Sequence, residues 1–124
     1  MAIFWFNEDN KDLIATIASS NITLNKPAKN LIEFAYSVMI GVSPDEMKAY
    51  IKALDKETVE KGEYPLSQLY TVTICSSYGR ITNKGFIKKL SDITGIDYSK
   101  PKKYFMEYEE DDHMLIIDLK KEVK

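Results

Sequence analysis

The sequence predicts an α+β fold: a sheet-rich compact domain or a swapped-hairpin-like barrel built from two βαββ-like units with short helices. Short runs of β-branched and aromatic residues alternate with turn-forming residues, and two short helical stripes each follow an asparagine. This order of elements occurs twice. The 124 residues are expected to form a single domain, 1–124. Its two units are expected at about 12–57 and 70–122, joined by a polar connection at 58–69.

The first unit is expected to place strands around one short helix. Asn25 is suited to cap a helix and Pro27 suits its first turn. The apolar residues that then recur at helical spacing are Ala28, Leu31, Ile32 and Ala35. The runs that favour extended structure in this half of the chain are 2–6, 12–18, 22–24, 37–42 and 47–54. The first two of these runs are expected to form a hairpin around a polar turn.

The connection and the second unit follow the same logic. Residues 55–62 are expected to form a short helix or a solvated linker, and residues 65–69 a helical turn. Tyr70–Cys75 alternates most cleanly of all and is the clearest strand pattern in the chain. After this strand we expect a turn at Gly79 and a helix that is capped by Asn83 and ends at Gly95. The apolar stripe of this helix consists of Phe86, Ile87, Leu90 and Ile93. Two further strands are expected at 102–108 and 113–119, around a charged turn.

The two units are related by an internal repeat. A shift of 58 residues, the difference between 83 and 25, places Asn25 on Asn83 and keeps the two helical stripes in phase. Near the unit ends a shift of 65, the difference between 116 and 51, places Ile51 on Ile116. A true repeat means that neither unit can bury its apolar face alone. Chance similarity between two amphipathic βαββ stretches is the alternative.

One stretch resembles a known family. The resembling residues are Gly79-Arg80-Ile81-Thr82-Asn83-Lys84, then Leu90, Gly95-Ile96 and Met114-Leu115-Ile116-Ile117. This pattern is similar to the SpoVT/AbrB-like family. The resemblance implies a swapped-hairpin barrel in which two βαββ units interlock, and it implies DNA binding, which is common in that family. Such proteins usually pair two chains of one unit each, whereas both units lie in one chain here.

Composition narrows the classes of function. With Cys75 as the only cysteine, an intramolecular disulfide and an all-cysteine zinc cluster are both excluded. Cys75 is expected to be a small core residue, with a reactive thiol as the minor alternative. The apolar start, Met1–Phe6, is too short for a signal peptide, and no apolar run reaches membrane-spanning length. We therefore expect a cytoplasmic protein without membrane contact.

A basic stretch carries the first functional hypothesis. The chain has a net charge of −2, yet the segment from Ser76 to Met106 contains seven basic residues and only two acidic ones. Phosphate backbones attract such a patch, so we expect a small bacterial DNA-binding or transcription-regulatory protein. The residues expected to contact duplex DNA are Arg80, Lys84, Lys88 and Lys89, with Lys26 and Lys29 as counterparts in the first unit. The alternative is that these lysines only solvate a helix face and a strand edge.

The second hypothesis is a non-enzymatic protein-interaction module, an adaptor or an inhibitor that could belong to a mobile element. The acidic stretches 55–63 and 107–112 suit a basic partner surface. A small-molecule site between the two units is a third alternative. No catalytic residue, cofactor or metal site is expected, because His113 is the only histidine and no phosphate loop or nucleophile elbow is present. The consecutive acids of 109–112 are expected to form a hairpin tip, since calcium loops space their ligands.

Overall fold

The computed structural model describes residues 12–123, and the strand expected at 2–6 lies outside these residues. The elements in chain order are β1 (Leu13–Ile17), β2 (Asn21–Leu24), α1 (Lys26–Leu31), β3 (Ser37–Ser43), β4 (Lys48–Leu54), α2 (Lys56–Glu60), the 3-10 helix η1 (Leu66–Gln68), β5 (Thr73–Ile74), β6 (Gly79–Thr82), α3 (Lys84–Thr94), β7 (Lys102–Glu109) and β8 (Met114–Glu122). Few, short helices beside many strands confirm the predicted α+β class.

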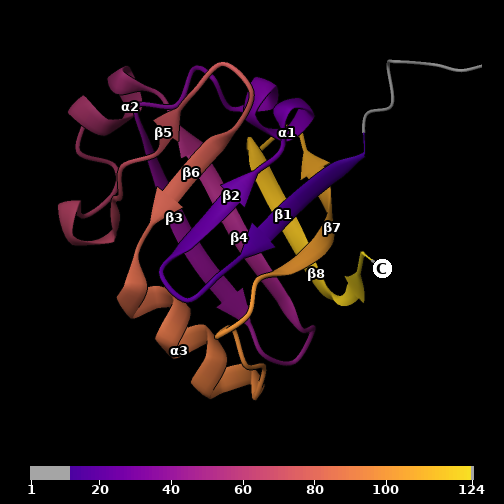
Figure 1. Cartoon of the computed structure of the whole chain (residues 1–124). Helices are drawn as coiled ribbons and strands as arrows, with labels where there is room; N and C mark the ends of the chain where they lie inside the picture. The colour runs from indigo at the N-terminus through magenta and orange to yellow at the C-terminus, as the bar shows by residue number, and fades with distance from the viewer. Residues whose placement is uncertain (1–11, 124) are drawn as a thin grey trace, which may run out of the picture.

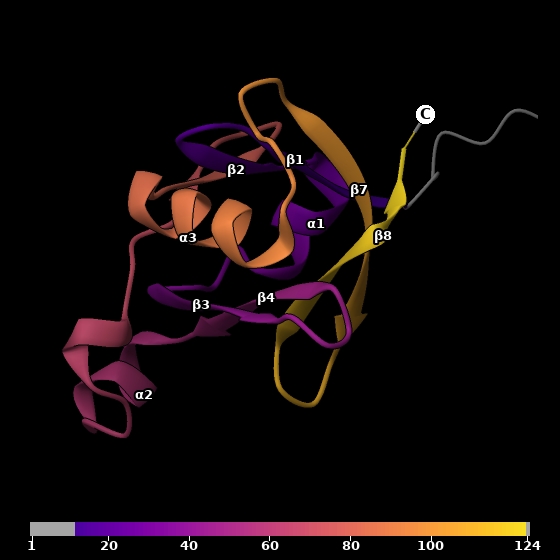
Figure 2. The same ribbon diagram turned by 90° about the horizontal axis from the view of Figure 1, so that it is seen from below.

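The strands form a single antiparallel sheet that curls into a half-barrel. Its strand order is β3-β4-β8-β7-β1-β2-β6-β5, so β3 and β5 lie at the two edges. Figure 1 and Figure 2 show the two ends of this order bending toward each other on the side of the molecule that carries α2. One isolated bridge joins β3 to the segment that precedes β5, because the N–H and C=O of Val38 both bond to Tyr70 at 2.9 Å. We call the opening between β3 and β5 the seam.

The same element order recurs along the chain, and the two copies interleave. β1, β2, α1, β3 and β4 correspond to β5, β6, α3, β7 and β8. Strand β2 pairs with β6 and β4 pairs with β8, so equivalent strands meet at two places in the sheet. Ile22 lies opposite Ile81 and Ile51 lies opposite Leu115. Because β7 also pairs with β1, each copy completes the sheet of the other.

The offset between the two hairpins is 66 residues rather than the 65 expected from the sequence. Met47 and His113, 66 apart, are the two non-glycine residues with positive φ in the described chain, at 53° and 51°, and each ends a hairpin turn. This offset places Ile51 on the equally buried Ile117, whereas 65 would place it on the half-buried Ile116. The register of β7 with β8 shifts between Tyr104 and Met106, where the partner residue changes from Glu122 to Ile117.

Two asparagines start the two main helices, as the sequence predicts. The Asn25 side chain accepts from the Ala28 N–H at 3.3 Å, and that of Asn83 accepts from the Phe86 N–H at 3.0 Å. The helices then lie at opposite ends of the curled sheet, with α1 at the top and α3 at the bottom of Figure 1. Helix α1 ends at Leu31, earlier than its apolar stripe suggests, because the chain must turn back into β3.

Helix α3 follows its predicted stripe with one exception. Ile87 and Leu90 are buried, Phe86 is half-buried, and Ile93 is 38% exposed. Gly95 ends the helix in the left-handed conformation, with φ of 74°.

Two local predictions of the second unit are wrong. Tyr70–Cys75 was expected as a full strand, yet only Thr73–Ile74 pairs as β5, because the chain at Tyr70 bonds to β3 and then crosses to the other edge. Gly79 was expected to turn the chain but is the first residue of β6. The turn lies at residues 76–77 and is closed by the Cys75 N–H, which donates to the Tyr78 carbonyl at 2.8 Å.

Candidate functional site

The residues predicted to contact DNA are mostly exposed. Arg80 projects from β6, and its guanidinium carbon lies 5.1 Å from the centre of the Tyr78 ring, in cation–π geometry. Lys84, Lys88 and Lys89 are exposed on α3, and Lys26 is exposed at the start of α1. Because α1 and α3 lie at opposite ends of the sheet, the structure separates Lys26 from the three lysines of α3 (Figure 1).

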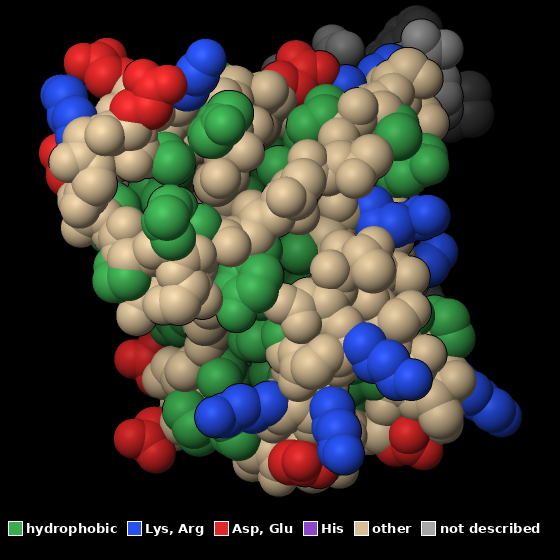
Figure 3. Space-filling model, turned by 90° about the vertical axis from the view of Figure 1, so that its left-hand side faces the viewer, with side chains coloured by type: hydrophobic (Ala, Val, Ile, Leu, Met, Phe, Trp, Pro, Cys, Tyr) green, Lys and Arg blue, Asp and Glu red, His purple; other side chains and the backbone are tan. Residues whose placement is uncertain are grey.

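Lys29 is the exception among the six. It is only 5% exposed, and its ammonium lies 2.5 Å from the Glu33 carboxylate. Its stem packs beside Gly79, where an added Cβ would come within 3.5 Å of the Lys29 Cβ. A buried, paired ammonium serves the packing of α1 against β6, so Lys29 does not present its charge to a phosphate. Figure 3 also shows acidic side chains among the basic ones on the face that it presents.

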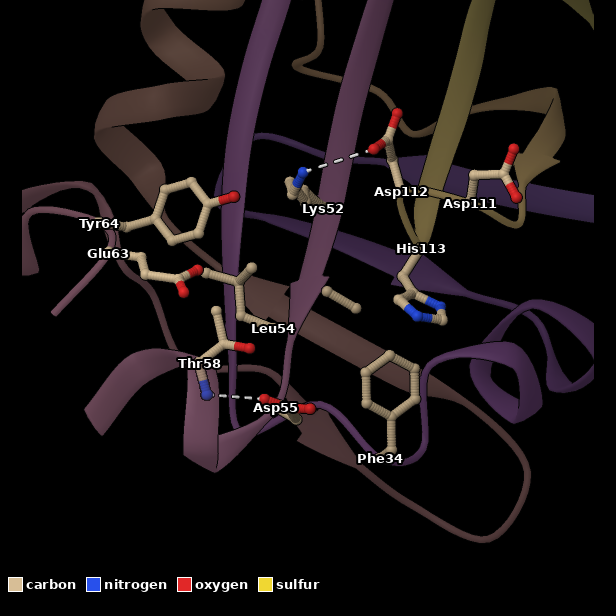
Figure 4. Close-up of a pocket in the computed structure, with 11 residues that line it drawn as sticks. Phe34, Lys52, Leu54, Asp55, Thr58, Glu63, Tyr64, Asp111, Asp112 and His113 are labelled. Carbon is tan, nitrogen blue, oxygen red and sulfur yellow. Dashed lines mark hydrogen bonds and ion pairs between the residues drawn. The ribbon is translucent and has the colours of Figure 1, made fainter. Parts of the chain in front are cut away.

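A pocket at the end of β4 brings together the two acidic stretches of the chain. It encloses about 190 Å³ and is lined by Phe34, Lys52, Ala53, Leu54, Asp55, Thr58, Glu63, Tyr64, Asp111, Asp112 and His113. Figure 4 shows Glu63 and Tyr64 on one side of β4, and Asp112 and His113 on the other. We call this site the acidic pocket.

One lysine and four carboxylates line the acidic pocket. The Lys52 ammonium lies 3.9 Å from Asp112 and 5.8 Å from the centre of the Tyr64 ring. The Asp55 side chain caps the start of α2, because it accepts a hydrogen bond from the Thr58 N–H at 2.8 Å. This bond lowers the pKa of the Asp55 carboxyl. Close by, a hydrogen bond with Asp112 raises the pKa of Glu109. The pocket therefore already holds one cation between a carboxylate and an aromatic ring.

Aromatic side chains form the other wall. Phe34 is 45% exposed and meets the His113 ring edge-on, with ring centres 5.0 Å apart. The His113 ring nitrogen Nδ1 lies 3.1 Å from the Tyr108 hydroxyl, and its carbonyl accepts from the Ala53 N–H at 2.9 Å. These contacts tie the β7–β8 turn to β4, so His113 shapes the pocket.

Sequence reasoning expected the acidic stretches to face a partner, but it did not single out Phe34 or Tyr64. A pattern for Phe34 exists in the sequence: it falls just off the apolar stripe of the first helix, as does Tyr36. Aromatic residues that leave the buried face of a helix have to lie on the surface or in a connection. Tyr64 has no such pattern, because its place depends on how the connection folds back along β4.

The other kinds of feature to consider in residues 12–123 are a cysteine–histidine site, a metal site and a membrane-spanning helix. Cys75 is half-buried beside Tyr78, and His113 contacts Phe34 and Tyr108, so the thiol and the imidazole have separate surroundings. In this part of the chain no group of three His, Cys, Asp or Glu residues is arranged to hold a metal ion. None of the described helices is long and apolar enough to span a bilayer.

Comparison of the chain with protein-family models, with curated proteins and with solved structures gives no match. The resemblance to the SpoVT/AbrB-like family therefore stays a prediction from the residues quoted above. Function has to be argued from the site itself.

Proposed function

We propose that this protein is a non-catalytic interaction module that binds a basic segment of another protein through the acidic pocket. The observation that carries the proposal is the meeting of two acidic segments, distant in sequence, around one aromatic-walled pocket. An adaptor or an inhibitor of a basic partner would use such a surface. Its action requires binding alone, which suits a site without a paired nucleophile and base.

Charge is the first support for a basic partner. Asp55, Glu63, Asp111 and Asp112 outnumber Lys52 by four to one around the pocket. Within the described chain, Glu63 and Asp111 make no ion pair. An arginine or lysine side chain would gain Coulomb energy there and would also meet the Tyr64 and Phe34 rings.

Exposed aromatic surface is the second support. Phe34 and Tyr36 are 45% and 55% exposed, and they lie in the same connection between α1 and β3. Aromatic side chains supply much of the binding energy at protein interfaces, particularly beside desolvated charges. A partner segment that combines arginine with apolar residues matches both parts of this surface.

The proposal is tested with a labelled peptide of alternating arginine and leucine, measured by fluorescence anisotropy against a peptide with glutamine in place of arginine. We expect the arginine peptide to bind more tightly, and the Asp111→Asn, Asp112→Asn double variant to weaken it by about tenfold. The matched control is Asp45→Asn, Glu46→Gln, which removes two charges from the equivalent β3–β4 turn and leaves the pocket intact. Equal binding of both peptides, or equal loss in both variants, contradicts the proposal.

DNA binding is a second proposal, favoured by the exposure of five of the six predicted cations and by the stacked Arg80–Tyr78 pair. In this case the protein acts as a small transcription regulator. The test is a titration of random-sequence duplex DNA at two salt concentrations, with an Arg80→Ala, Lys84→Ala double variant. Salt-sensitive binding that is lost in this variant supports DNA recognition, whereas no binding at low salt overturns it.

A further inference from the structure

The edge strand β3 lacks the protection that edge strands usually carry. Its seven residues, Ser37–Ser43, contain no charge and no proline, and they pair with β4 on one side only. The opposite edge strand, β5, has only two residues. Natural proteins usually shield such an edge with lysine, proline, a bulge or a covering loop, because its free N–H and C=O groups attract another strand.

The seam leaves a defined part of this edge open. Val38 directs its N–H and C=O away from β4, to Tyr70. Backbone groups alternate along an antiparallel strand, so Ile40 and Val42 direct theirs to the same side. Among residues 12–123, no strand or backbone bond meets these two residues there. The open edge therefore consists of the outward groups of Ile40 and Val42, with Gly41 between them.

This open edge is complementary to a second copy of itself. In an antiparallel pair centred on Gly41, Ile40 of each chain lies opposite Val42 of the other, and all the open groups become bonded. The outward side of Val38 is already filled by Tyr70, so the pairing is confined to residues 40–42. The second chain has to leave the edge at Pro44, where its own β3–β4 turn begins and where proline has no N–H to satisfy.

The side chains are compatible with this register. Ile40 and Val42 share the inner face with the fully buried Val38 and would form β-branched cross-strand pairs with their counterparts. Gly41 points to the outer face, and an added Cβ would have no atom within 4 Å. At the twofold axis the two Gly41 residues can approach each other without a clash.

The surface around the seam supports a second copy as the occupant. Apolar side chains gather across this face in Figure 3, and Leu66 and Tyr70 beside the bridge are 79% and 38% exposed. Strand β3 begins near α2 and ends toward α3 (Figure 1). The segment 55–63 has four acidic and two basic residues, whereas α3 has three lysines and one aspartate. An antiparallel pair sets the acidic end of one copy against the basic end of the other.

We propose that the open edge of β3 pairs antiparallel with β3 of a second copy, about a twofold axis at Gly41, to form a homodimer with a continuous sheet. This inference can be tested apart from the proposed function. The dimer and the acidic pocket share the acidic segment 55–63, whereas Asp111 and Asp112 belong to the pocket alone. A strand from a different protein is the competing occupant, and a monomer in solution would favour it.

The test uses charge at the axis. Sedimentation velocity over about a hundredfold range of protein concentration is expected to show a monomer–dimer equilibrium for the unchanged chain. Gly41→Lys and Gly41→Glu each set two like charges opposite each other and should raise the dissociation constant at least tenfold. An equimolar mixture of the two should restore the dimer, with the heterodimer mass in native mass spectrometry. Gly41→Thr, which adds a β-branched but uncharged side chain, should keep the dimer.

Each outcome decides the inference. Thermal unfolding of every variant serves as the folding control, since the open space at Gly41 predicts an unchanged monomer. A wild-type chain that stays monomeric at all concentrations overturns the proposal, as does a dimer that Gly41→Lys leaves equally stable. Asp111→Asn with Asp112→Asn should leave the dimer intact, so failure of the dimer and failure of the pocket are separate results.

Discussion

At the scale of single residues, the two helix caps show how equivalent positions can differ in importance. The Asn83 side chain makes one hydrogen bond, to the Phe86 N–H. The Asn25 side chain accepts from the Ala28 and Ile14 N–H groups and donates to the Asp12 carbonyl at 2.8 Å. Asn25 thus joins α1 to β1 as well as starting the helix.

We expect Asn83→Ala to lower the free energy of unfolding by about 1 kcal/mol, the usual cost of a lost cap. Asn25→Ala should cost about 2 kcal/mol, because it also leaves the part-buried Ile14 N–H without its partner. Urea denaturation of both variants measures the difference. An equal cost at the two sites would show that the bonds of Asn25 to β1 contribute nothing.

Buried tyrosines are a second feature at the residue scale. Tyr98 is 3% exposed and Tyr104 is 1% exposed, with their hydroxyl oxygens 3.5 Å apart. Burial, and then the neighbouring Tyr104 hydroxyl, raises the pKa of Tyr98, and burial likewise raises the pKa of Tyr104. The folded chain therefore holds these phenolic protons more tightly than the unfolded chain does.

Stability should consequently fall at alkaline pH. A raised folded pKa means that the contribution is fully present below the unfolded pKa of about 10 and is lost as pH rises above it. Tyr98→Phe should flatten this decline, and Tyr36→Phe, at an exposed position, should not. Denaturant midpoints between about pH 8 and pH 11 provide the measurement. If the stability of Tyr98→Phe falls as steeply with pH as that of the unchanged chain, other groups cause the loss of stability at alkaline pH.

At the scale of elements, the sequence predicts what depends on neighbouring residues. The asparagine caps, the glycine that ends α3 and the strands around both hairpins follow from side-chain chemistry over a few positions. The strand expected at Tyr70–Cys75 does not follow in this way. Its apolar and polar residues alternate because Val72 is buried and Thr71 is exposed, yet neither residue pairs with another strand as part of β5. Which edge a segment joins is decided by the whole sheet.

The candidate site likewise has a part that the sequence predicts and a part that only the whole sheet determines. The acidic stretches of the pocket are visible in the sequence as runs of charge. Their meeting is not, because it depends on β4 pairing with β8, which carries the β7–β8 turn to the side of α2. Lys29 is the opposite case: its charge suggests solvent, yet helix α1 packs its stem beside Gly79.

At the scale of the whole molecule, interleaving makes the two units dependent on each other. Strand β7 pairs with the edge of β1, and β8 pairs with the edge of β4. Either unit alone would therefore expose these strand edges and half of the shared core. We expect a chain cut at Gly62 into two separately produced halves to leave each half unfolded. Mixing the halves should restore the sheet.

Far-ultraviolet circular dichroism and amide nuclear magnetic resonance spectra of each half and of the mixture provide this measurement. A second cut, placed inside the β3–β4 turn at Asp45, serves as the comparison, because it separates two strands that pair directly with each other. If one half folds alone to a dispersed spectrum, the units are independent and the pairing of β1 with β7 is dispensable.

The position of β7 and β1 in the middle of the strand order also affects how the chain can be tethered. Leu13 lies opposite Met106, and the Val123 N–H donates to the Lys103 carbonyl at 2.8 Å, so both ends of the described chain run along β7. The seam is at the two ends of the strand order, on the opposite wall. A fluorophore or a sensor surface attached at Asp12 or Val123, where the described chain begins and ends, would stand behind the sheet and leave the edge of β3 accessible.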